Sequence, residues 1–247
     1  MRTLAHLSTS RDPDPRVRAL SGVVQNLGMR LDHLSYAAGP DGLVGTAKRI
    51  GELLGQEFED GGVHPRFGTR NYTLPLRGGI YLEVVECLDH PASDKAPFGQ
   101  AVKARSALGG GWLGWVISVD DITRVEERLG RPAQPGNRHK PDGTELRWKQ
   151  LGLSDLIVDP QLPYFLEWEM PAELHPGNAG SDVTLTAIEL SGDPQRVRDY
   201  IGESLRERVD PWTGKPAENV EVRWVAEHGT PGLVAANFAT PNGTVRI

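Results

Sequence analysis

The chain has 247 residues, of which 38% are hydrophobic and 24% charged, a composition typical of a folded globular protein rather than a disordered one. The net charge of −6 argues against nucleic acid or an anionic membrane surface as the main partner, because either requires a basic face. The single cysteine, Cys87, excludes an intrachain disulfide and a cysteine-rich zinc site. No apolar run is long enough for a transmembrane helix, and the N-terminus lacks the apolar segment of a secretory signal, so we predict a cytoplasmic protein.

Residues 1–30 are predicted to form a poorly ordered leader. Residues 11–16 are charged and interrupted by two prolines, which disfavours regular structure. Met29 stands two residues before the first predicted strand. Both Met1 and Met29 therefore remain candidate translation starts.

The first predicted module, residues 31–90, reads as a strand, a helix and three further strands. A strand over 31–38 is followed by turn residues, and then by a helix over 43–54 whose Leu43, Ala47, Ile50 and Leu54 lie on one face. Gly55 is a typical C-terminal stop for such a helix. Strands are predicted over 57–60, 70–76 and 80–87, with a loop over 61–69.

The same order of elements recurs twice after a connector, residues 91–111, in which we predict a helix over 98–108. The second module, 112–172, has a predicted strand over 113–119, a helix over 122–129, a polar loop over 132–143, and strands over 144–151 and 164–170. The third module, 173–247, has a predicted strand over 184–191, a helix over 195–208, and strands over 220–226, 232–239 and 244–247.

This threefold recurrence predicts an α+β protein in which the modules pack on one another. One such module is a half-open curved sheet that cannot exclude water from its concave face alone, so two modules side by side should close into a barrel-like cleft. The third module would complete itself against the first two, against the C-terminal strands or against another subunit. A homodimer is therefore one open arrangement.

Several short segments together resemble the vicinal oxygen chelate superfamily, and within it the glyoxalase-like domain proteins. They are residues 32–34, 53–55, 64–71, 81–83, 141–148 and 166–168, and the resemblance covers 31–170. It implies tandem βαβββ modules that form a barrel-like cleft, here with a third βαββ-type module at the C-terminus. Because members include metal enzymes and metal-free binding proteins, the fold does not decide the chemistry.

The resemblance also implies metal ligands on the first and last strands of each paired module. Those positions hold His33, Glu83, Gly114 and Glu167, and glycine offers no ligand. A three-ligand site of His33, Glu83 and Glu167 suits Zn, Ni, Mn, Fe or Co. A pocket without metal is the alternative, and the absence of a second histidine ligand disfavours ring-cleaving dioxygenase chemistry.

Side-chain alternation predicts which way the two glutamates face. Tyr81, Glu83 and Val85 share one face of their strand, and Phe165 and Glu167 share one face of theirs. A carboxylate among apolar neighbours is costly unless it is bound or paired. A buried arginine–glutamate pair is the structural alternative to a metal site.

The cleft rim is predicted to bind a small oxygen-rich molecule. His64, Arg70, Asn71, Arg147 and Trp148 are the candidate contacts, because cations and an amide suit a carboxylate or other oxygenated group. One interpretation is metal-assisted lyase or isomerase chemistry in which Glu83 or Glu167 moves a proton. The alternative is a metal-free, resistance-type protein that binds or sequesters its ligand without catalysis.

Overall fold

The computed structural model describes residues 28–202 and 220–247. The predicted leader up to residue 27, and residues 203–208 of the third predicted helix, lie outside the described residues. Within the described ranges, no helix combines the length and the apolar character needed to cross a membrane.

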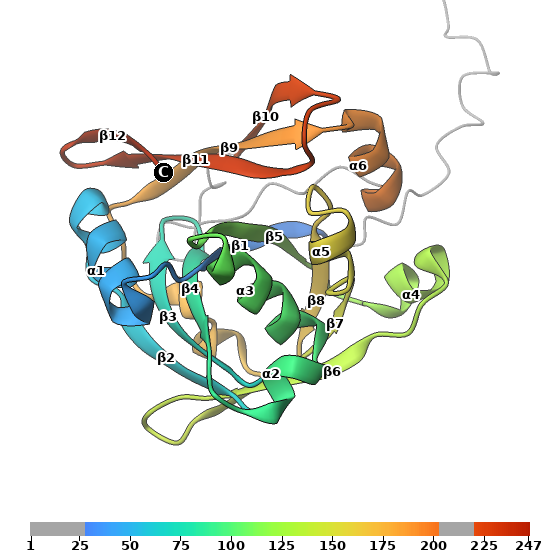
Figure 1. The fold of residues 1–247 in the computed structure, drawn as a ribbon, viewed down its shortest axis with the longest axis horizontal. Helices are drawn as coiled ribbons and strands as arrows, with labels where there is room; N and C mark the ends of the chain where they lie inside the picture. Colours follow the sequence, from blue (N-terminus) through green and yellow to red (C-terminus); the bar gives the residue numbers. More distant parts are fainter. Residues whose placement is uncertain (1–27, 203–219) are drawn as a thin grey trace, which may run out of the picture.

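Two βαβββ modules make up the main body of the molecule, as predicted (Figure 1). The first consists of β1 (Arg30–Ala37), α1 (Gly42–Leu54), β2 (Glu59–His64), β3 (Thr69–Leu76) and β4 (Ile80–Cys87). The second consists of β5 (Gly111–Ser118), α4 (Thr123–Leu129), β6 (Gln134–His139), β7 (Glu145–Leu151), α5 (Asp155–Val158) and β8 (Tyr164–Trp168). Two helices, α2 (Pro91–Lys95) and α3 (Pro97–Ala107), connect them.

The eight strands form a closed barrel in the order β1-β4-β3-β2-β6-β7-β8-β5. Each module contributes one parallel pair, β1 with β4 and β5 with β8, and the modules meet at two antiparallel seams. The β1–β5 seam runs the length of both strands, whereas the β2–β6 seam has a single register pair, Val63 with His139. The predicted cleft is therefore an enclosed barrel with one weakly paired seam.

Local sequence explains why the first module forms as it does. The helix α1 buries Leu43, Ala47, Ile50 and Leu54 against the outer face of the barrel, and Gly55 ends it in a left-handed conformation with φ 70°. On β4, Leu82 and Val84 join that outer core, while Val85 packs in the interior. The strand's alternation thus separates the outer core from the barrel lumen.

The barrel interior is closed at one end by α3, which lies across the strands in Figure 1. Phe98, Ala101 and Val102 of this helix pack with Val116, Leu146 and Leu166 from three strands. The lumen is thus a packed core with a polar cavity rather than an open channel, as expected of an eight-stranded barrel.

A second sheet follows the short 3₁₀ turns η2 (Ala172–Leu174) and η3 (Pro176–Asn178). Its strands are β9 (Thr184–Gly192), β10 (Glu221–Glu227), β11 (Gly232–Thr240) and β12 (Gly243–Arg246), in the spatial order β10-β9-β11-β12. The helix α6 (Pro194–Ile201) follows β9. In the first module the strand after the helix, β2, lies farthest from β1, whereas here the strand after the helix, β10, pairs in parallel with β9. The third module therefore repeats the order of elements but not the strand pairing of the first two.

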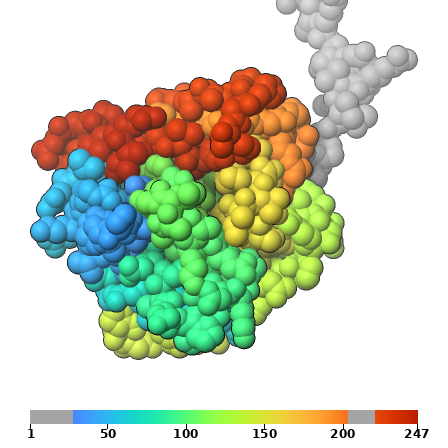
Figure 2. Space-filling model, in the orientation of Figure 1, coloured from blue at the N-terminus to red at the C-terminus, as the bar shows by residue number. Residues whose placement is uncertain are grey.

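This second sheet shares one hydrophobic core with the outside of the barrel. It lies along one side of the barrel in Figure 1, and the red C-terminal strands lie directly over the barrel's surface in Figure 2. Trp112 Nε1 donates a hydrogen bond to the carbonyl of Ile247 at 2.9 Å, and Arg77 N donates to the carbonyl of Val183 at 2.7 Å. The third module therefore completes itself within the chain.

Two differences from the sequence-based prediction change which residues line the barrel. The strand β2 continues through His64, where a loop was predicted, and β6 forms inside the predicted polar loop 132–143. Residues 134–139 contain a proline and a glycine, which disfavour strands, but β7 pairs with all six of them. Pairing in the tertiary structure therefore outweighs local propensity.

We expect Gly62 to be required at the β2–β6 seam. Its φ is +100°, and a Cβ there would lie 1.8 Å from the carbonyl oxygen of His139. Gly62→Ala should lower the free energy of unfolding by more than the roughly 1–2 kcal/mol that a left-handed backbone alone costs. Gly243→Ala, with φ +122° and nothing within 4 Å, is the matched control in urea unfolding. Equal losses in the two variants would contradict a tight seam.

Candidate functional site

A small polar cavity lies inside the barrel, below α3. Its volume open to water-sized groups is about 30 Å³, which is room for on the order of two water molecules. Aromatic rings supply most of its wall, and polar side chains face it from seven strands. The lining residues are His33, His64, Phe67, Asn71, Tyr81, Glu83, Phe98, Arg138, Trp148, Gln150, Tyr164, Leu166 and Trp168.

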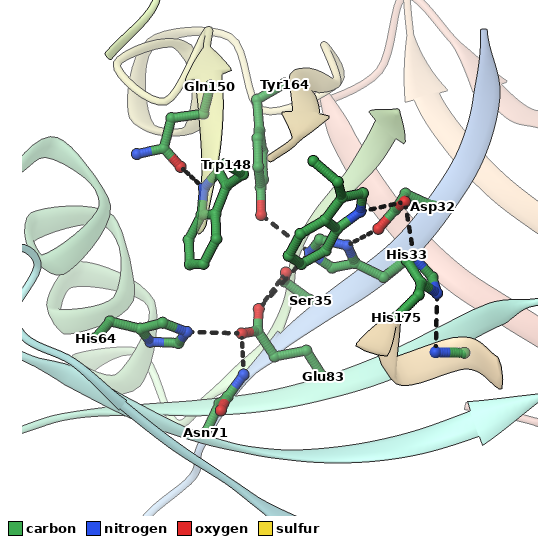
Figure 3. Close-up of polar contacts among 12 residues, drawn as sticks. Asp32, His33, Ser35, His64, Asn71, Glu83, Trp148, Gln150, Tyr164 and His175 are labelled. Atoms are coloured by element: carbon green, nitrogen blue, oxygen red, sulfur yellow. Dashed lines mark hydrogen bonds and ion pairs between the residues drawn. The ribbon is translucent and has the colours of Figure 1, made fainter. Parts of the chain in front are cut away.

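A β-bulge brings two consecutive side chains of β1 together. The β1–β5 register skips Asp32, so Leu31 pairs with Ile117 and His33 with Val116. Consecutive residues of a regular strand face opposite ways, whereas a bulge re-aims one of them. His33 Nδ1 accordingly lies 2.8 Å from Asp32 Oδ1 (Figure 3).

The Asp32 carboxylate is fully buried and accepts hydrogen bonds from two more side chains. Trp168 Nε1 and His175 Nε2 each lie 3.1 Å from Oδ2. The backbone N–H of Gly177 donates to His175 Nδ1, so Nε2 carries the proton that His175 gives to Asp32. Burial alone raises the pKa of Asp32, but His175 and His33 outweigh it and hold that pKa well below its usual range.

These contacts also fix the orientation of His33. Because Asp32 accepts from Nδ1–H, the neutral ring has its lone pair on Nε2, which faces the cavity. The Tyr164 hydroxyl lies 3.1 Å from Nε2 and donates to it. Burial, with Glu83 next in weight, raises the pKa of Tyr164 well above its usual value, so this hydroxyl keeps its proton. The ring of Tyr81 stacks on His33 at 4.3 Å.

The Glu83 carboxylate lies at the centre of the cavity, between two imidazoles. Ser35 Oγ donates to Oε2 and Asn71 Nδ2 to Oε1, each at 2.7 Å (Figure 3). His33 Nε2 is 4.0 Å from Oε2, and His64 Nε2 is 3.9 Å from Oε1. Burial raises the pKa of Glu83, but the two imidazoles and the two hydrogen bonds together lower it, so Glu83 is ionised at neutral pH.

His64 faces the same carboxylate from β2. Its Nδ1 lies 2.9 Å from Thr69 Oγ1, and the ring is buried. Burial lowers the pKa of His64 to about 4, although Glu83 opposes that effect. His64 is therefore a neutral hydrogen-bonding group at physiological pH.

A buried arginine lines the cavity from β6, the strand that the sequence did not predict. Arg138 is 3% exposed, and one of its terminal nitrogens donates to Asn71 Oδ1 at 3.1 Å. Within residues 28–202 and 220–247 its guanidinium has no ion-pair partner within 4.0 Å. Burial lowers its pKa, but an arginine remains charged at neutral pH. This cation is available to an anionic group in the cavity.

The structure separates the sequence-predicted residues into two groups. His33, Glu83, His64, Asn71 and Trp148 line the cavity together. The other three predicted residues lie on the outside of the barrel. Arg147 is exposed, Arg70 pairs with Asp60 at 3.6 Å, and Glu167 is half-buried beside α4.

Glu167 differs from its predicted orientation because β8 is offset by one residue from the alternation we assumed. Tyr164, Leu166 and Trp168 face the lumen, and Phe165 packs in the outer core. The carboxylate of Glu167 accepts from the backbone N–H of Ile122 at 2.8 Å, so it caps the start of α4. Its outward position on β8 separates it from His33 and Glu83.

The predicted three-ligand metal site does not fit this arrangement. Both oxygens of Glu83 accept from protein donors, and Glu167 lies outside the barrel. In the part of the chain that the structure describes, no group of three or more His, Cys, Asp or Glu side chains is placed to hold a metal ion.

Sequence reasoning missed Asp32, Ser35, Tyr164 and Arg138. Asp32 reaches His33 only through the bulge, and Arg138 lies on a strand formed by tertiary pairing. Side-chain alternation could have identified Ser35, since it shares the face of His33 on a regular strand. The same alternation could have identified Tyr164 only if the register of β8 had been known.

Comparison with known proteins agrees with this architecture. The glyoxalase-like domain family model matches residues 31–201. A solved structure of a hypothetical protein from Staphylococcus aureus is similar over 89% of this chain and 85% of its own, with 12% identity and a TM-score of 0.55. No curated protein matches the chain.

Structures of methylmalonyl-CoA epimerases are also similar, at lower scores. The epimerase from Mycobacterium tuberculosis covers 56% of this chain and 86% of its own length, with 15% identity and a TM-score of 0.39. A Streptomyces coelicolor epimerase variant in complex with 2-nitronate-propionyl-CoA covers 56% and 95%, with 18% identity and a TM-score of 0.40.

A closed barrel of two βαβββ modules around a polar cavity defines a protein of the vicinal oxygen chelate class. Within that class, the chain belongs to the glyoxalase-like domain family.

Replacement of Asp32 should destabilise the protein in a pH-dependent way. An asparagine would replace one accepting oxygen with an NH₂ group, which cannot accept from the donors that surround Asp32. We therefore expect Asp32→Asn to lower the free energy of unfolding by roughly 2–4 kcal/mol at pH 7. Because the folded-state pKa is lowered, the wild-type advantage is present above the unfolded pKa of about 3.9 and is lost as pH falls through the folded value. Urea unfolding between pH 2 and 7 measures it, with exposed Asp199→Asn as the control. A pH-independent difference would contradict this account.

The buried His64 should make the protein less stable in mild acid. Its folded pKa of about 4 lies below the unfolded value of about 6.5, so the unfolded chain binds the extra proton within that window. The wild-type protein should lose unfolding free energy between pH 6.5 and pH 4. In His64→Gln that loss should be smaller than in the wild type by roughly 2–4 kcal/mol. Exposed His139→Gln is the control, and NMR titration of the wild-type His64 ring should show no protonation above pH 5. A midpoint near 6.5 would refute burial of the ring.

Proposed function

We propose that this protein binds a small oxygen-rich molecule in the barrel cavity and moves a proton at a carbon beside its carbonyl group. The observation that carries the proposal is the ionised Glu83 carboxylate, 4.0 Å from an imidazole that the buried Asp32 orients. Isomerases and lyases of carbonyl compounds need this combination of an oriented base and a nearby charge.

His33 is the proposed base. Its Nε2 lone pair faces the cavity, and an imidazole suits proton transfer near neutral pH. When Nε2 takes up a proton, the ring becomes a cation between the carboxylates of Asp32 and Glu83. Both anions stabilise that cation, as the acid does in an Asp-His pair. Tyr164 then has its hydroxyl free to donate to the oxygen on which charge develops.

Arg138 and Asn71 are the proposed binding groups. The buried guanidinium attracts an anion, and its planar fork of donors matches a carboxylate. Trp148, Phe98 and Phe67 form the apolar wall and exclude water from the reacting atoms. The substrate class that these groups suit has a 2-oxo or 2-hydroxy carboxylate head, of which the cavity takes only a few atoms.

Two other hypotheses compete with this proposal. One is chemistry assisted by a divalent metal on His33, Glu83 and Glu167, and the other is ligand sequestration without catalysis. The positions of Glu167 and of the donors to Glu83 favour the metal-independent mechanism.

Exchange of carbon-bound hydrogen in D₂O tests the proposal without a known substrate. Chelator-treated protein is incubated with a panel of small 2-oxo and 2-hydroxy carboxylates, and proton NMR follows the loss of the signal next to the carbonyl. We expect exchange with at least one compound, lowered roughly 10²–10⁴-fold in His33→Gln and Glu83→Gln. Arg138→Met should raise the KM, because it removes the cation.

Glu167→Gln and Arg147→Met are the matched controls, since both side chains lie outside the barrel and should leave exchange unchanged. Exchange that requires added Zn, Ni, Mn, Fe or Co and disappears in Glu167→Gln would establish the metal hypothesis instead. Saturable binding without exchange would establish sequestration. If no compound of the panel shows binding or exchange, the proposal is refuted.

A further inference from the structure

A second, larger cavity adjoins the first. Its volume open to water-sized groups is about 330 Å³. Its wall comes from the loop after β2, the start of α3, the segment leading into β6, and the end of β7 with the residues that follow. Arg66, Phe67, Arg131, Gln150 and Leu153 are among these residues.

Phe67 and Gln150 line both cavities and therefore separate them. Phe67 is 7% exposed and packs edge-on against Phe98, with the ring centres 5.7 Å apart. A ligand that spans both cavities must displace this ring. The two residues form a neck between an inner chamber that is nearly full and an outer chamber about ten times larger.

Gln150 carries an unused hydrogen-bond donor at this neck. Trp148 Nε1 can only donate, and it donates to Gln150 at 2.6 Å, so the atom it contacts is the amide oxygen. The amide nitrogen is therefore Nε2, which is buried and, among the described residues, has no hydrogen-bond partner. A buried donor left unpaired is destabilising, and an acceptor oxygen on a ligand would satisfy it.

The outer chamber has an apolar wall and one available cation. Pro97, Pro132, Pro135 and Leu153 supply flat or branched apolar surface. Arg131 already binds both oxygens of Asp155, at 3.0 and 2.7 Å. Arg66, by contrast, is exposed at the wall, and within the described ranges it has no ion pair.

We propose that the outer chamber binds the body of an elongated substrate: an aryl or branched-alkyl group that ends in an anion near Arg66. The carbonyl oxygen that joins this body to the reacting head accepts a hydrogen bond from Gln150 Nε2 at the neck. Only the oxygenated head enters the inner chamber, whose volume admits little more. The proposal deepens the proposed function by defining the substrate class, and it rests on that function only for the fate of the head.

An aryl sulfonate dye tests the outer chamber directly. 8-Anilinonaphthalene-1-sulfonate has an apolar aryl body and one anion, and we expect it to bind the folded protein at one saturable site with enhanced fluorescence. Arg66→Glu should raise its Kd about tenfold, an effect that added salt reduces. Arg147→Glu is the matched control, because it reverses another exposed arginine, one that lies outside both chambers, and should leave the Kd unchanged.

A second readout locates the dye at the neck. The side-chain NH₂ signals of Gln150, assigned by their absence in Gln150→Leu, should shift in ¹H–¹⁵N spectra when the dye is added. His33→Gln should bind the dye with the same Kd as the wild type. Dye binding therefore tests the outer chamber separately from the proposed proton transfer. The proposal is overturned if the dye does not bind, if Arg66→Glu and Arg147→Glu have equal Kd values, or if the Gln150 signals do not move.

Discussion

The buried carboxylate of Asp32 is the constraint on which the site depends. An ionised carboxylate without water is tolerated only where donors replace the water, and Asp32 has three: His33, Trp168 and His175. These come from β1, from the end of β8 and from the segment that leads to the second sheet. The same anion therefore orients the proposed base and ties the second sheet's connection to the barrel.

Closure of the barrel sets what the cavity can accept. Two modules meeting at only one seam would leave a groove open along its length, whereas the β2–β6 contact brings His64 and Arg138 to the same lumen. Aromatic side chains then fill most of the enclosed space. A ligand larger than a few atoms must therefore lie partly outside the lumen. Phe67 and Gln150 line both the inner and the outer chamber, at the place where such a ligand would leave it.

Membership of the glyoxalase-like domain family does not by itself decide the chemistry, because one fold carries many reactions. The proposed chemistry rests on local hydrogen bonds. Ser35 and Asn71 donate to both oxygens of Glu83, and Glu167 lies outside the barrel, so the predicted metal ligands do not converge. An ionised acid beside an oriented imidazole is the arrangement that results, and it favours proton transfer.

The sequence determined the βαβββ modules, the helix α1 and the inward orientation of Glu83, because periodicity and turn residues act over a few neighbouring positions. It did not determine β6, whose Pro-Gly segment becomes a strand only by pairing with β7, or the offset of β8 that turns Glu167 outward. Nor did it reveal that Asp32 and His33 act together, since a bulge depends on the partner strand. Register, bulges and barrel closure are set by contacts between distant segments, and those contacts assembled the cavity.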